Sequence, residues 1–134
     1  MKRRQEREET FFMLFESVFA PDRTAEEIYE QAKECREVEE SEYVRTVLAG
    51  AIEKREELGA LIEKHAKGWQ LERITPIVRA AMLLAAYEIV YMPDIPGRVS
   101  INEAIELIKK YDDEKARVFV NGVLNAIWRE VSPS

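Results

Sequence analysis

The sequence contains one cysteine and one histidine in 134 residues, and this scarcity excludes several kinds of site. Cys35 has no second cysteine with which to form an intrachain disulfide, and a reducing cytoplasm is the simplest setting for such a chain. Cys35 and His65 together cannot supply the ligands of a structural zinc site. We therefore expect a cytoplasmic protein without a metal site, in which His65 has a partly buried structural role.

Long apolar runs and the common catalytic motifs are also missing. No apolar stretch approaches the roughly 18 uninterrupted residues that span a bilayer, and glutamates interrupt the basic N-terminus, unlike a signal peptide. The chain has no glycine-rich phosphate loop, dinucleotide fingerprint or nucleophile elbow. These absences predict a protein that does not enter a membrane, binds no cofactor and has no catalytic residues.

Glycine and proline are scarce as well, at five each, whereas 46% of the residues are hydrophobic and 34% are charged. This composition is typical of a helical protein with a core of its own, and the chain shows no β-type alternation, repeat or linker. The sequence predicts one compact all-α domain over residues 1–134. Apolar residues at helical spacing indicate six helices, at about 4–19, from 24, 41–62, 75–91, from 100, and 114–131.

The expected helix at 75–91 is apolar on nearly all sides, which indicates that other helices enclose it. Its only charged residues, Arg79 and Glu88, are nine positions apart and lie on opposite sides, so we expect each to emerge at a different end. At the next expected helix, Ser100 and Glu103 have the spacing of a capping box, in which each side chain bonds an amide of the first turn.

Positive charge is concentrated at the N-terminus, although the net charge of the chain is −6. Lys2, Arg3, Arg4 and Arg7 are opposed there only by Glu6, whereas residues 22–42 are strongly acidic. Any nucleic-acid site must therefore be local. Two interpretations of the basic cluster stay open: a frayed, solvated terminus, or an arm whose arginines contact phosphates.

A second candidate site lies on the last expected helix. At about 100° per residue, Phe119 falls roughly 90° from the centre of the apolar stripe, on the same flank as Lys115 and Gly122. An aromatic ring beside a cation and a bare backbone is suited to stacking on an unpaired base. The alternative is that Phe119 packs on a neighbouring helix and Gly122, which costs about 1 kcal/mol in a helix, permits a close crossing.

Several short runs resemble the NusB family of bacterial transcription antitermination factors. The most specific are residues 101–104 (Ile-Asn-Glu-Ala) and 119–122 (Phe-Val-Asn-Gly), with 94–96 (Asp-Ile-Pro) between the flanking helices. The N-terminal arginines, followed by Leu14 and Phe15, are similar to an arginine-rich motif and a Leu-Tyr pair of the family. The resemblance covers nearly the whole chain and is strongest at 74–124.

The resemblance implies an all-α bundle of about seven helices that binds boxA single-stranded RNA. It also implies a joint action with NusE, a small-subunit ribosomal protein, in antitermination complexes on RNA polymerase. Carried over by position, it implies RNA contacts at Arg3, Arg4, Arg7, Phe15 and Phe119. With the residues beside them and in the matching runs, the candidate RNA-binding residues are Lys2, Arg3, Arg4, Arg7, Phe15, Arg79, Lys115, Phe119 and Asn121.

Two other functions stay open. A domain similar to NusB can serve a separate rRNA methyltransferase, because such domains also occur fused to rRNA cytosine methyltransferases, although this chain lacks a glycine-rich cofactor-binding unit. A purely structural adaptor between proteins is the other alternative. The oligomeric state is also open, and includes a homodimer that covers the RNA-binding face.

Overall fold

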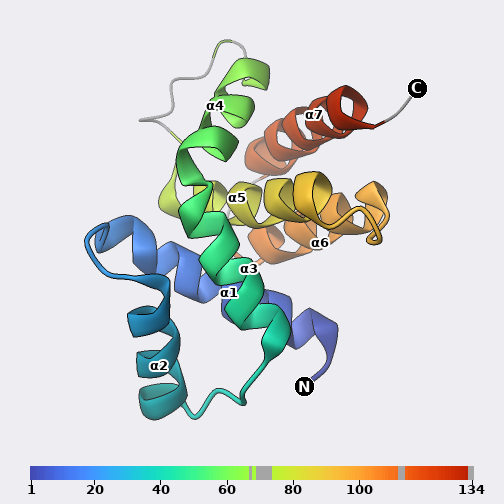
Figure 1. Ribbon diagram of the computed structural model, residues 1–134. Helices are drawn as coiled ribbons and strands as arrows, with labels where there is room; N and C mark the ends of the chain where they lie inside the picture. Colours follow the sequence, from blue (N-terminus) through green and yellow to red (C-terminus); the bar gives the residue numbers. More distant parts are fainter. Residues whose placement is uncertain (67, 69–73, 112–113, 133–134) are drawn as a thin grey trace.

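The computed structural model describes residues 1–66, 68, 74–111 and 114–132, and it confirms an all-α fold (Figure 1). The helices of this part of the chain are α1 (Arg3–Phe19), α2 (Ala25–Arg36), α3 (Glu42–Glu53), α4 (Arg55–His65), α5 (Pro76–Tyr91), α6 (Gly97–Lys109) and α7 (Glu114–Val131). None of these helices is both long and apolar enough to cross a lipid bilayer.

Helix α5 is the centre of the fold, as its apolar composition predicts. It contacts α1, α3, α4, α6 and α7, and Figure 1 shows it in the middle, with α4 and α7 above it and α1 below. Thr75 caps its start, where the side-chain oxygen accepts a hydrogen bond of 3.2 Å from the amide of Val78. The enclosed helix therefore carries the interactions that hold these five helices in place.

The helix expected at 41–62 is divided in the structure. Helix α3 ends at Glu53 and α4 begins at Arg55, with Lys54 between them at φ −96° and ψ 15°. The break lets α3 pack on α1 and α2, while α4 packs on α5 and α7. Because Leu58 continues the apolar stripe and is fully buried, the periodicity of the sequence did not reveal the change of direction.

The predicted capping box at Ser100 is wrong. Helix α6 begins three residues earlier, at Gly97, with Pro96 as its N-cap, so Ser100 lies within the first turn and is buried. The fixed φ of proline suits a helix start, and the Pro96 carbonyl accepts hydrogen bonds from the backbone amides of Val99 and Ser100. The Ser100 side chain is thereby left for a contact with another helix.

Gly97 is required by the packing of α6 against α7. A Cβ atom at this position would lie 2.4 Å from Cε2 and Nε1 of Trp128. We expect Gly97→Ala to lower the free energy of unfolding by about 1–3 kcal/mol, the usual cost of overpacking. Gly59→Ala is the matched control, because nothing lies within 4 Å of its Cβ position, and it should raise stability by up to about 1 kcal/mol. Urea denaturation measures both, and equal effects would contradict the prediction.

Candidate nucleic-acid interface

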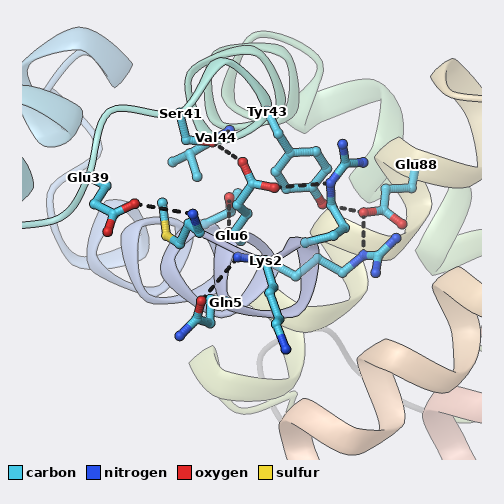
Figure 2. A network of polar contacts seen from close by, with 12 residues as sticks. Lys2, Gln5, Glu6, Glu39, Ser41, Tyr43, Val44 and Glu88 are labelled. Atoms are coloured by element: carbon cyan, nitrogen blue, oxygen red, sulfur yellow. Dashed lines mark hydrogen bonds and ion pairs between the residues drawn. The ribbon is translucent and has the colours of Figure 1, made fainter.

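A single buried carboxylate connects four helices next to the basic N-terminus. Glu88 of α5 is 1% exposed and accepts hydrogen bonds from Arg7 Nε of α1 at 2.8 Å and from Ser100 Oγ of α6 at 2.7 Å. The hydroxyl of Tyr43, on α3, donates a third (Figure 2). The expectation that Glu88 emerges at an end of its helix is therefore wrong, because a buried charge needs partners and these three donors supply them.

Arg7 belongs to this buried cluster and not to the exposed part of the basic arm. Its side chain is only 8% exposed. Burial alone would lower the pKa of Arg7, but the hydrogen bond and charge of Glu88 outweigh it and the pKa is raised. Burial, with the charge of Glu88, raises the pKa of Tyr43 as well. Arg7 therefore stays charged and bound to Glu88, a role that its position in the arginine cluster did not indicate.

The rest of the arm forms the start of α1. The guanidinium of Arg3 lies 4.3 Å from the centre of the Tyr43 ring and forms an ion pair of 3.2 Å with Glu6. Glu6 in turn accepts a hydrogen bond from Ser41 (Figure 2). The N-cap residue Lys2 has its amide bonded to the Gln5 side chain at 3.1 Å. The cationic side chains thus start from a fixed backbone.

Side-chain contacts link α1 to α6 and to the two residues that directly follow α6, in the same order along both segments. Arg4 pairs with Glu103 at 3.0 Å. One helical turn further, Glu8 pairs with Lys110, also at 3.0 Å. Next, Phe11 stacks on Tyr111 with ring centres 5.9 Å apart. We call this line of side chains, from Arg4 and Glu103 to Phe11 and Tyr111, the α1–α6 edge.

The α1–α6 edge ends in an apolar groove that contains Phe15. The groove is lined by Phe11, Phe12, Phe15, Ile77 and Tyr111. Phe15 is half-buried and contacts Phe19 edge-on, with ring centres 5.2 Å apart. An aromatic ring is thus accessible at the end of a line that begins with cations. Of the residues predicted at the N-terminus, Arg4 and Phe15 therefore lie at the two ends of this line, whereas Arg7 is buried.

The second predicted site follows directly in the chain, since α7 begins three residues after Tyr111. Phe119 is half-buried against the core, and a shallow pocket there is lined by Glu114, Lys115, Val118 and Phe119. Asn121 is exposed, but it lies two residues further along α7, about 200° around the helix from Phe119. The margin position predicted for Phe119 is confirmed, with the ring neither fully buried nor fully exposed.

Gly122 and Arg79 do not fit their expected surroundings. A Cβ at the exposed Gly122 would meet nothing within 4 Å, so no described part of the chain makes the close crossing that this glycine would permit. Arg79 lies between α4 and α5, in a pocket that Arg55 and Glu63 also line. It is on the side of α5 opposite Glu88. The structure therefore does not bring Arg79 to the α1–α6 edge.

Comparison with known proteins places the chain in a family. The sequence model described as "NusB family" matches residues 4–129. Transcription antitermination protein NusB of Bacillus subtilis is 40% identical over 134 residues, which is 100% of both chains. The structure of NusB from T. maritima superposes with a TM-score of 0.88 at 33% identity, covering 99% of this chain and 94% of that one. A structure of antitermination factors NusB and NusE in complex with dsRNA has a TM-score of 0.83 at 27% identity, covering 97% and 99%. The chain therefore belongs to the NusB family.

Proposed function

We propose that this protein is a non-enzymatic, cytoplasmic transcription antitermination factor that acts as one RNA-binding domain over residues 1–134. It binds boxA-type single-stranded RNA together with the ribosomal protein NusE, in complexes on RNA polymerase. The observation that carries the proposal is the α1–α6 edge, which places exposed cations and an accessible aromatic groove in one line. A relative named as an antitermination protein and a similar NusB–NusE structure with dsRNA support it.

The chemistry of the edge, of the N-terminus beside it and of α7 gives most of the candidate residues a role. Lys2, Arg3 and Arg4 contact phosphates, which position an RNA strand without reading its sequence. Phe15 and Phe119 offer ring faces on which unpaired bases stack. The exposed Lys115, one turn before Phe119 on the same flank of α7, adds a charge next to the stacked base, whereas Asn121 lies about 200° around the helix and is given no contact with this base. Arg7 and Arg79 stay outside this surface, because one is buried and the other faces α4.

The proposal is tested by the salt dependence of RNA binding. We expect the triple variant Lys2→Ala, Arg3→Ala and Arg4→Ala to bind boxA RNA more weakly and with a shallower salt slope. Each lost phosphate contact removes about 0.7 from the slope of log K against log salt, so three contacts remove about 2. Fluorescence anisotropy with labelled RNA, with NusE present, measures both quantities between low and moderate salt.

The matched control removes three cations from the acidic side of the molecule. Lys33, Arg36 and Arg45 lie on α2 and α3, where each is paired with glutamates. Their replacement by alanine changes the net charge equally and should leave the salt slope unchanged. Equal slopes for the wild type and the arm variant would remove the arm from the site. Binding to an rRNA methyltransferase without binding to RNA would favour the alternative function.

A further inference from the structure

We propose that Glu103 competes with RNA phosphate for Arg4, so that RNA binding exchanges an intramolecular carboxylate for a phosphate and this acid limits the affinity for RNA. The inference rests on the proposed function, since it concerns the same surface. It assigns to Glu103 a regulatory contact that opposes the ligand, in addition to its contact between α1 and α6.

The pair occupies one of the two forked edges of the Arg4 guanidinium, the edge formed by Nε and Nη2. Nη2 of Arg4 bonds one carboxylate oxygen of Glu103 at 3.0 Å and Nε bonds the other at 3.3 Å. This two-bond fork is the arrangement in which a guanidinium also binds phosphate. The same N–H groups cannot serve a carboxylate and a phosphate at once, so a phosphate that binds Arg4 through this edge must displace Glu103.

The exposed fractions of the two side chains show that an RNA phosphate can reach Arg4. The Arg4 side chain is 75% exposed, whereas that of Glu103 is 17% exposed. A strand in solution can therefore reach the guanidinium, while Glu103 stays in place on α6 as a fixed competitor. Exposed ion pairs contribute little to stability, so the pair orients Arg4 without locking it. The hydrogen bond and charge of Glu103 raise the pKa of Arg4, as expected for a partner that stabilises the cation.

The arrangement is repeated along the α1–α6 edge. Lys110 pairs with Glu8 at 3.0 Å. Beside the edge, on the side of α1 that faces Tyr43, Arg3 pairs with Glu6 at 3.2 Å. Arg4 and Lys110 of the edge, and Arg3 next to it, are thus each paired with an acid on α1 or α6 in the free protein. A polyanion gains full attraction only after it opens these pairs, which restrains binding by charge alone on a chain of net charge −6.

The test is a gain of affinity, which damage to the fold cannot produce. Glu103→Gln removes the charge while its amide oxygen can still accept a bond from Arg4. We expect this variant to bind boxA RNA about two- to fivefold more tightly at low salt, the factor that corresponds to a surface ion pair. Glu106→Gln is the matched control, because Glu106 is exposed on the same helix and acts on Arg4 only by its charge. Its gain should be smaller.

An Arg4→Ala background separates the two proposals. If Glu103 acts through Arg4, the excess gain of Glu103→Gln over Glu106→Gln disappears in this background. If Arg4→Ala weakens RNA binding but Glu103→Gln gains no more than Glu106→Gln, the competition is overturned and the proposed function stands. If Arg4→Ala and the arm variant leave RNA binding unchanged, both are overturned. Glu8→Gln repeats the comparison at the next pair, because Glu8 pairs with Lys110. It should also tighten RNA binding, and this gain should disappear in a Lys110→Ala background.

Discussion

Replacement of Arg7 by alanine is expected to lower the free energy of unfolding by about 3–5 kcal/mol, because it leaves a charge buried without its ionic partner. Glu88 would retain the hydroxyls of Tyr43 and Ser100, but neither carries a positive charge. The carboxylate would then be protonated or drive local opening, and both weaken the attachment of α1 to α5. Urea denaturation followed by circular dichroism measures the change.

Arg4→Ala is the matched control for this prediction, since it removes an exposed arginine from the same helix. Its ion pair with Glu103 is open to solvent, so the substitution should change stability little while it weakens RNA binding. If the Arg7→Ala variant is as stable as the wild type, the predicted contribution of the buried ion pair is contradicted. The contrast also shows why Arg7 is left out of the arm variant, where its loss would mix unfolding with weaker binding.

Phe119→Ala is expected to weaken RNA binding by about 1–3 kcal/mol, the loss typical of a base-stacking aromatic residue. Because the ring is only half-buried, stability should fall by less than the roughly 3–5 kcal/mol for a fully buried phenylalanine. A thermal melt together with an RNA titration at fixed salt, with NusE present in both cases, measures the two effects on one preparation.

Leu124→Ala is the control on the same helix, because its side chain is fully buried in the core. It should cost about 2–5 kcal/mol of stability and leave the RNA affinity of the folded fraction unchanged. If Phe119→Ala behaves in the same way, with a large drop in melting temperature and retained affinity, the ring is a core residue and not a stacking platform.

Local features of the fold could be predicted from the sequence because short-range chemistry decides them. The caps at Thr24 and Thr75 depend only on residues three positions ahead in the chain, and both are present in the structure. The enclosure of α5 follows from its apolar composition alone. The marginal position of Phe119 follows from helix geometry, because 100° per residue fixes which side of α7 it occupies.

The candidate site divides in the same way. The residue types at the N-terminus and on α7 are enough to indicate phosphate contacts and stacking. The contacts of α1 with Glu103, Lys110 and Tyr111 were not predicted, because they depend on where the end of α6 lies relative to α1. Glu88 carried the one signal that could have been used: an acid in an otherwise apolar helix must have a buried partner.

By itself, the sequence determined most of the helical segments, the central helix and the kinds of side chain available to bind RNA, since composition, capping and periodicity act over a few residues. Only the tertiary structure decided that Arg7 is buried and that Ser100 turns away from its helix start. It also decided that α3 and α4 separate at Lys54. Periodicity tells which face of a helix is buried but not what it meets, and Glu88 meets Arg7 across 81 positions of the chain.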